Sequence, residues 1–268
     1  MDNIRLICCD LDGTLLGSDK NISKENIEWI RKVRTEEKIP FAFVTGRPNL
    51  SVRRYFRALK LIGYSSCLNG CELVNEYGRV LISHRMSPEV IAAIVRCQRK
   101  TGIDMLMISG NSWFTEKQSG YMYEKKLPIY LRKSILCTFE EILDVNKILF
   151  MSQDPDDIGA LAEAVLSEVG DPSLVTLYPG ADFLEIMPGG INKGTGLEEL
   201  ASRTGTKLSE IMVIGDDLND VEMFQKAGYS VAMGNSRDEV KALAKYVTSD
   251  NDHDGVANAI RHVVFSGR

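Results

Sequence analysis

Two carboxylates stand close together near the start of the chain, directly after a short apolar run. Asp10 and Asp12 lie in residues 10–14 (DLDGT), which follow the apolar run 4–9. Residues two apart in an extended chain share a face, so both carboxylates would point at one spot. Carboxylates that close repel each other unless a cation or a shared proton lies between them. A set of hard oxygen ligands of this kind suits Mg²⁺. A solvated turn with acidic caps is the alternative interpretation.

A second acidic segment follows another apolar run near the end of the chain. Residues 215–220 (GDDLND) contain Asp216, Asp217, Asn219 and Asp220. This concentration of negative charge is costly, and a bound metal would offset it. The alternative is an acidic loop that caps the next helix, where carboxylates interact favourably with the helix dipole.

Two further segments have the chemistry of an anion site. Thr45 and Gly46 follow the apolar run 41–44 and precede a predicted helix. A hydroxyl and free backbone N–H groups at a helix start can bind an anion. Lys193 begins another predicted helix and could place a positive charge on a phosphate oxygen. Taken singly, a helix-capping threonine and a surface lysine are the commoner interpretations of these residues.

Strands and helices alternate around these residues at both ends of the chain. Apolar runs predict strands at 4–9, 41–44, 65–68, 211–214 and 230–233, and helical spacing predicts helices at 23–38, from 48 onward, and at 193–203, 221–227, 239–244 and 255–264. This alternation is typical of a doubly wound α/β fold with a parallel, Rossmann-like sheet. Ligands of such sheets bind at the carboxyl ends of the strands, so the four segments are predicted to meet there.

The middle of the chain has a different pattern and predicts an inserted α+β domain. A hairpin is predicted at 72–75 and 79–83. Helices are then predicted at 88–100 and 156–169, strands at 105–108, 147–151, 174–178 and 183–187, and an irregular aromatic stretch at 113–130. We therefore expect a core domain formed by residues 1–83 and 189–268, and a cap domain formed by residues 84–188.

The role of the aromatic stretch is open on sequence grounds. Its rings could form a lid surface that faces a sugar, or they could fill the core of the inserted domain, which is the favoured interpretation. The aromatic residues concerned are Trp113, Phe114, Tyr121, Tyr123 and Tyr130. Three charged residues, Arg47, Asp182 and Glu185, are further candidates to face the cleft. The three histidines, His84, His253 and His262, have no partners at ligand spacing and are interpreted as structural or surface residues.

Composition and charge exclude several classes of protein. The 268 residues are 44% apolar and 26% charged, with a net charge of −5 and a pI near 5.4. This acidic balance argues against a nucleic-acid binder. No apolar run is long enough to span a membrane, and the first residues do not resemble a signal peptide. We expect a cytoplasmic protein with reduced cysteines, in which Cys67 and Cys71 are unrelated thiols and not metal ligands.

The four segments resemble the motifs of the haloacid dehalogenase superfamily. Residues 10–14, Thr45, Lys193 and residues 215–220 match its four motifs in order. The large insert between the second and third motifs is similar to that of Cof-type sugar-phosphate phosphatases with an α/β cap. The resemblance covers essentially the whole chain. In the loop after the third strand, residues 68–71 read LNGC; Asn69-Gly70 matches relatives, whereas Cys71 stands where small residues are usual.

The resemblance implies a role for each matching residue. Asp10 would attack phosphorus and form an aspartyl-phosphate, and Asp12 would act as general acid and then general base. Mg²⁺ would be bound by the Asp10 carboxylate, the Asp12 backbone carbonyl and Asp216. The phosphoryl group would be bound by Thr45, Lys193 and Asn219, together with the backbone amides near Leu11 and Gly46. Asp220 and Asp217 would support these residues without contacting the phosphoryl group.

The implied activity is hydrolysis of small phosphate monoesters, with sugar phosphates as the expected substrates. Three alternatives remain open at this point. One is a phosphomutase of the phosphomannomutase type, and another is a non-catalytic sensor of a phosphorylated metabolite. A receiver-like signalling module is the third, but it has little need of a large insert. The sequence predicts neither the particular phosphate ester nor the oligomeric state.

Overall fold

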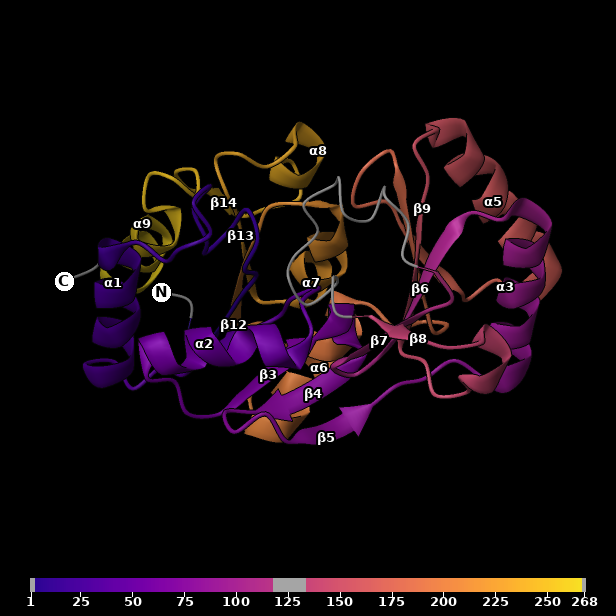
Figure 1. Ribbon diagram of the computed structural model, residues 1–268. Helices are drawn as coiled ribbons and strands as arrows, with labels where there is room; N and C mark the ends of the chain where they lie inside the picture. The colour runs from indigo at the N-terminus through magenta and orange to yellow at the C-terminus, as the bar shows by residue number, and fades with distance from the viewer. Residues whose placement is uncertain (1–2, 118–133, 267–268) are drawn as a thin grey trace. The chain divides into compact units, whose positions relative to one another are not determined.

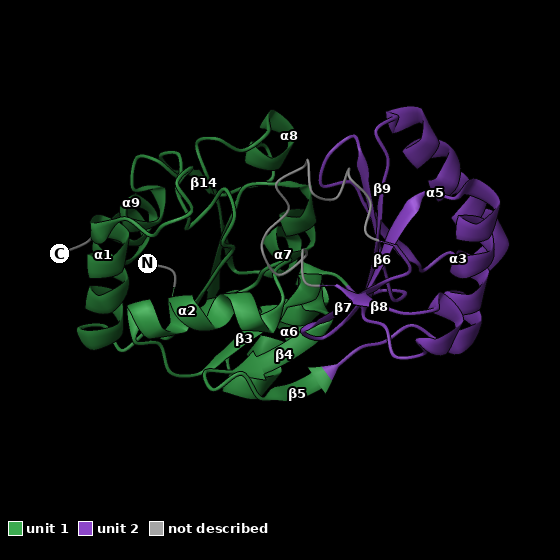
Figure 2. Cartoon of the chain, in the orientation of Figure 1, with its two compact units in different colours: residues 1–82, 192–268 green, residues 83–191 purple. Residues whose placement is uncertain are grey.

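A computed structural model describes residues 3–117 and 134–266 of the chain. It divides into two compact units (Figure 2). Unit 1 comprises residues 1–82 and 192–268, and unit 2 comprises residues 83–191. The boundaries expected from the sequence, after residues 83 and 188, differ from this division by one residue and by three. Both ends of the chain thus build unit 1.

The central sheet of unit 1 is parallel and has the strand order β14-β13-β12-β1-β2. Figure 1 labels β12, β13 and β14 of this sheet. Its strands are β1 (Leu6–Cys9), β2 (Phe41–Phe43), β12 (Ile211–Gly215), β13 (Tyr229–Ala232) and β14 (Tyr246–Val247). The chain leaves β1 toward β2 on one side and returns beside it as β12 on the other. The strand order therefore switches direction next to β1, and ligands bind at such switch points in open α/β sheets.

Helices cover both faces of this sheet, as the doubly wound prediction requires. One core contains side chains of α1 (Lys24–Thr35), α2 (Asn49–Leu59) and α9 (Gly255–Ile260); the other contains side chains of α6 (Lys193–Thr204), α7 (Val221–Lys226) and α8 (Asp238–Lys241). Alternate residues of β1 divide between the two cores, with Ile7 in the first and Leu6 in the second. A π-helical turn, Arg261–Phe265, continues α9 where the sequence predicts regular helix.

The third predicted strand exists but lies outside the parallel ladder. β3 (Tyr64–Cys67) pairs antiparallel with β4 (Glu72–Asn75), and β5 (Val80–Ser83) completes a three-stranded sheet. A single parallel bridge joins Val44 to Ser66. The amide of Phe43 donates to the Ser65 hydroxyl at 3.1 Å, so a side chain replaces the backbone acceptor that a continued ladder would need. The predicted placement of this strand in the parallel sheet was therefore wrong, whereas the β4–β5 hairpin is confirmed.

Unit 2 contains a six-stranded sheet in the order β10-β11-β9-β6-β7-β8. Its strands are β6 (Asp104–Ser109), β7 (Ser112–Thr115), β8 (Ile135–Leu136), β9 (Lys147–Met151), β10 (Val175–Leu177) and β11 (Phe183–Met187). Two amphipathic helices, α3 (Pro88–Thr101) and α5 (Pro155–Val169), share one apolar core with β6, β9 and β11. The helices and strands predicted for this region are confirmed.

The aromatic stretch was wrongly predicted to be irregular where it enters the sheet. Trp113 and Phe114 lie on β7, and Trp113 is buried, which favours the core interpretation for that ring. Tyr121, Tyr123 and Tyr130 lie outside the described residues.

All six cysteines are free thiols, and Cys67 and Cys71 are both buried. His253 is exposed beside Asp250, and His262 stacks on Tyr246. Within residues 3–117 and 134–266, no helix combines the length and the apolar character needed to cross a membrane.

Candidate active site

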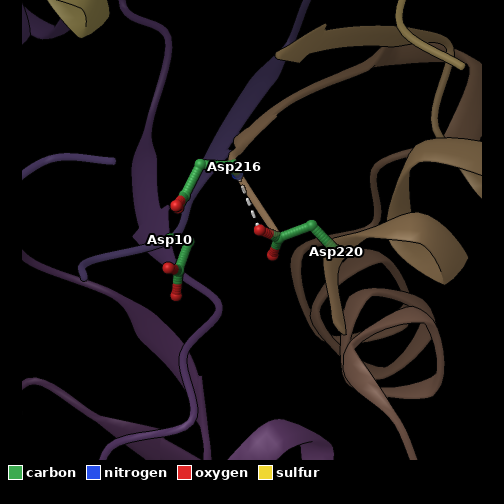
Figure 3. A group of neighbouring side chains, drawn as sticks. All are labelled: Asp10, Asp216 and Asp220. Atoms are coloured by element: carbon green, nitrogen blue, oxygen red, sulfur yellow. Dashed lines mark hydrogen bonds between the residues drawn. The ribbon is translucent and has the colours of Figure 1, made fainter. Parts of the chain in front are cut away.

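The carboxyl ends of β1 and β12 bring the two acidic segments together. Cys9 pairs with Ile214 in the parallel register, and the amide of Asp10 donates to the Ile214 carbonyl at 2.9 Å. Asp10 and Asp216 therefore begin the loops that leave neighbouring strands at the same edge. One carboxylate oxygen from each of Asp10, Asp216 and Asp220 lies within 4.8 Å of the others. Figure 3 shows the three side chains.

Lys193 is buried among these acids. Its side chain is 1% exposed, and its Nζ lies 2.9 Å from Asp10 Oδ1 and 2.6 Å from Asp220 Oδ1. Asn192 caps the N-terminus of α6, which fixes Lys193 as the first helical residue. Burial alone would lower the pKa of Lys193, but Asp10 and Asp220 raise it, so the ammonium stays charged. A buried charge needs such partners to offset its lost hydration.

Asp220 holds both the lysine and the loop before it. It is fully buried, and its Oδ1 accepts a hydrogen bond from Lys193 Nζ. Its Oδ2 accepts hydrogen bonds from the amides of Asp216 at 2.8 Å and Asp217 at 3.1 Å. Both oxygens are thus engaged, which fits the predicted supporting role better than a role as a metal ligand.

The two remaining carboxylates of the cluster are poorly stabilised as anions. Burial raises the pKa of Asp10 to about 8; Lys193 opposes this shift, and the charges of Asp220 and Asp216 add to it. Burial likewise raises the pKa of Asp216 to about 7, although the Thr14 hydroxyl opposes the shift by donating to Asp216 Oδ1 at 2.6 Å. A divalent cation between Asp10 and Asp216 would stabilise both ionised forms. Buried, all-oxygen ligands with surplus negative charge suit Mg²⁺.

Gly13 allows the first loop to pass close to the second. Its φ is +77°, and a Cβ built there would lie 2.2 Å from Asp216 Oδ2. Any side chain at this position would collide with the carboxylate. The DLDGT pattern therefore has a steric reason for its glycine, and Thr14 is a site residue for which the sequence reasoning gave no role.

Asp12 lies apart from the buried cluster. Its side chain is 44% exposed, and its two oxygens accept hydrogen bonds from Arg47 Nε at 2.5 Å and Arg47 Nη2 at 2.7 Å. Lys20 lies 3.2 Å from Asp12 Oδ1. Burial would raise the pKa of Asp12, but the hydrogen bonds and charge of Arg47, with Lys20, lower it. Asp12 is thus an ionised carboxylate in this structure, and Arg47 is a partner that the sequence reasoning placed only near the cleft.

The predicted phosphate-binding residues lie on the loops around the cluster. Thr45 is buried after β2, and its Oγ1 accepts the Arg47 amide at 3.2 Å. Gly46 follows it, and Leu11 is buried between the two aspartates. Asn219 donates from Nδ2 to Asn69 Oδ1 at 3.2 Å, a contact between distant segments that no sequence signal showed.

Asp217 is separated from the other acids of its segment. Its carboxylate is 48% exposed, lies 3.2 Å from Arg237 Nε and caps the amide of Leu218. Adjacent aspartates thus have different surroundings, with Asp216 facing the cluster and Asp217 facing a surface arginine. In unit 2, Glu185 forms an ion pair with Lys147 at 2.7 Å, and the carbonyl of Asp182 accepts the Ser152 amide.

Comparison with known proteins shows the family to which the chain belongs. Residues 7–260 match the family model of haloacid dehalogenase-like hydrolases. The chain is similar to the crystal structure of a haloacid dehalogenase-like hydrolase from Bacteroides thetaiotaomicron, with 30% identity, a TM-score of 0.85, and coverage of 97% of this chain and 99% of that one. A Thermotoga maritima protein has 25% identity and a TM-score of 0.84, with 97% of each chain covered.

A third solved structure, that of the HAD subclass IIB sugar phosphatase BT4131, shares the fold at 24% identity, with a TM-score of 0.82 and coverage of 96% of this chain and 98% of that one. The chain therefore belongs to the haloacid dehalogenase-like hydrolases. The family and the fold class expected from the sequence are confirmed.

Proposed function

We propose that the protein is a Mg²⁺-dependent phosphatase that hydrolyses small phosphate monoesters, sugar phosphates in particular, through an aspartyl-phosphate on Asp10. The observation that carries this proposal is the buried lysine among three convergent carboxylates at the switch point of the sheet. The Lys193 ammonium is a fixed positive charge, and the carboxylates around it outnumber it. This combination suits a site that binds both a metal and a phosphoryl group. Similarity in fold to the sugar phosphatase BT4131 supports the substrate class.

Asp10 is the nucleophile in this proposal. A carboxylate oxygen of Asp10 forms a bond to phosphorus as the bond between phosphorus and the leaving oxygen breaks. Lys193, 2.9 Å from Asp10 Oδ1, orients that carboxylate and favours its ionised form. Water then attacks phosphorus, the bond to Asp10 breaks, and inorganic phosphate leaves with Asp10 regenerated.

The Asp10 and Asp216 carboxylates, with the Asp12 backbone carbonyl, would bind Mg²⁺, which neutralises charge on the carboxylates and the phosphoryl oxygens. Thr14 orients Asp216 through its hydrogen bond to Oδ1. Asp220 keeps Lys193 in place through its contact with Nζ. Thr45, Asn219 and the amides near Leu11 and Gly46 would bind the phosphoryl oxygens.

Asp12 acts as general acid and base in this scheme. Asp12 is ionised while it is paired with Arg47, so it must first leave Arg47 and take up a proton from solvent. It then gives this proton to the leaving oxygen and later accepts one from the attacking water. Its oxygens are held by Arg47 here, so Asp12 has to exchange these contacts for the leaving group during the reaction. Arg47 thereby sets the position from which Asp12 starts. Unit 2 would act as the cap that recognises the leaving group and excludes water.

Release of inorganic phosphate from a panel of substrates tests this function. The panel contains sugar phosphates, nucleotides and p-nitrophenyl phosphate, each with Mg²⁺ and with EDTA. We expect release that requires Mg²⁺ and is highest for sugar phosphates. Release that is unaffected by EDTA would contradict the metal assignment, and a requirement for a sugar bisphosphate would indicate a mutase instead.

A further inference from the structure

The loop after β3 touches three of the four segments that form the site, yet the proposed chemistry gives it no part. This loop, Leu68–Gly70, is a 3₁₀ turn that starts at the end of β3. Leu68 and Asn69 both have left-handed backbone conformations, with φ of 51° and 54°. Such conformations are costly for residues other than glycine, and they concentrate at functional sites.

Backbone hydrogen bonds fix this loop against the Thr45 segment. The amide of Asn69 donates to the Thr45 carbonyl at 3.0 Å, and the amide of Leu68 donates to the Arg47 carbonyl at 3.0 Å. The two bonds flank Gly46. A Cβ built on Gly46 would lie 3.0 Å from Asn69 Oδ1, so the carboxamide of Asn69 packs directly on the Gly46 backbone.

The same loop contacts the two other segments of the site. Asn69 Oδ1 accepts a hydrogen bond from Asn219 Nδ2 at 3.2 Å. Gly70 packs on the start of α6, where a Cβ would lie 2.2 Å from the carbonyl oxygen of Asn192, the residue before Lys193. Asn69 is 2% exposed, so these contacts are made in a buried environment.

We propose that Asn69 is a positioning residue for phosphoryl binding, which acts by fixing the carboxamide of Asn219. This inference rests on the proposed function. The bond to Asn69 decides which end of the Asn219 carboxamide faces the site: one N–H of Nδ2 is used, and the second remains to donate to a phosphoryl oxygen. The strained turn holds the acceptor in place before substrate arrives, which is the preorganisation that phosphoryl transfer requires.

A double-mutant cycle tests this role. Asn69→Gly removes the carboxamide, and glycine adopts the left-handed backbone conformation without a steric penalty. We expect Asn69→Gly to lower kcat/KM for p-nitrophenyl phosphate about tenfold, as loss of one orienting hydrogen bond would. In an Asn219→Ala background the same change should cost less than about twofold, because the residue through which Asn69 acts is gone.

A matched control comes from the same small sheet. Asn75 uses its Oδ1 to accept the amides of Tyr77 and Arg79, so Asn75→Gly also removes a turn-forming carboxamide. It should leave kcat/KM within about twofold of wild type, since it touches none of the site loops. A tenfold loss of kcat/KM from Asn69→Gly that persists in the Asn219→Ala background would overturn the proposal. The absence of any loss of kcat/KM in both the wild-type and the Asn219→Ala background would overturn it as well.

Binding of inorganic phosphate with Mg²⁺, measured by calorimetry on the same variants, separates the two claims. Wild-type protein that turns over no substrate would contradict the proposed function. The phosphate Kd values would still decide whether Asn69 and Asn219 are coupled, because the cycle needs only binding.

Discussion

Each unit of the molecule buries a lysine beside a carboxylate, and the two lysines differ in their surroundings. In unit 1, Lys193 is 1% exposed and contacts Asp10 and Asp220, with Asp216 close by. In unit 2, Lys147 on β9 is 4% exposed and contacts Glu185 on β11. Among the described residues, a group of three acids that could hold a metal gathers only around Lys193.

The difference shows what distinguishes a site from a structural ion pair. A matched pair such as Lys147 and Glu185 offsets its own charge. The Lys193 cluster has more carboxylates than cations, and burial raises the pKa of both Asp10 and Asp216. Such an arrangement lowers the stability of the metal-free protein, which is the usual cost of a functional site.

The largest effect that this comparison predicts is loss of turnover in Asp10→Asn. The amide keeps the shape and can accept from Lys193, but it is a poor nucleophile, so kcat should fall by at least about a thousandfold. Phosphate release and the melting temperature, measured together, check this. A folded variant that retains a tenth of wild-type kcat would show that Asp10 is not the nucleophile.

Two adjacent aspartates provide the next test. Asp216→Asn should weaken Mg²⁺ binding and lower kcat/KM about a hundredfold, because it removes a charged oxygen ligand. Asp217→Asn should change kcat/KM by less than about twofold, because its exposed pair with Arg237 contributes little. Mg²⁺ titrations of activity measure both. Equal losses would show that the acidic segment acts as a diffuse charge and not through one ligand.

Removal of each buried lysine compares the two units directly. Lys193→Met leaves Asp10 and Asp220 without their cation and should lower the free energy of unfolding by about 3 kcal/mol. Lys147→Met should cost less, because Glu185 retains some solvent contact with 14% of its side chain exposed. Urea denaturation gives both values. Lys147→Met should also leave Mg²⁺ affinity unchanged, and a loss of that affinity would contradict the separation of roles.

The last prediction is a pH dependence of stability without metal. The folded-state pKa values of Asp10 and Asp216 are raised from 3.8 to about 8 and about 7. The folded protein therefore binds these protons more tightly than the unfolded chain does, and their contribution to stability falls as pH rises from about 4 to about 8. The Asp216→Asn variant lacks one of these groups. In EDTA, the amount by which its melting temperature exceeds that of wild type should therefore increase as the pH rises from about 4 to about 8. A constant difference in calorimetric scans would contradict the assignment.

The sequence predicts the framework of the site better than its contacts. Apolar runs that end in acidic segments predict β1, β12 and the meeting of Asp10 with Asp216, because parallel strands bring their carboxyl ends to one edge. Three contacts of the site depend on side-chain orientations and on loops that are distant in sequence. They are the pairs Arg47–Asp12, Thr14–Asp216 and Asn69–Asn219. No local pattern records these contacts.

The misplaced third strand has the same kind of cause. Its apolar and small residues predict a strand correctly. The Ser65 hydroxyl, however, accepts the hydrogen bond from the Phe43 amide, and the parallel ladder ends there. The prediction that the aromatic stretch is irregular was wrong for a related reason. Strand β7 is defined by its pairing with β6 and not by a strong local alternation of apolar and polar residues.

Trapping of the covalent intermediate tests the central claim most directly. In Asp12→Asn with Mg²⁺, p-nitrophenyl phosphate needs no general acid because its leaving group is good, whereas hydrolysis of the aspartyl-phosphate loses its base. We expect a burst of about one equivalent of p-nitrophenol per protein, and an acid-quenched protein whose added phosphoryl group maps to Asp10 by mass spectrometry. A phosphoryl group on another residue, or steady turnover with no covalent species, would contradict the account.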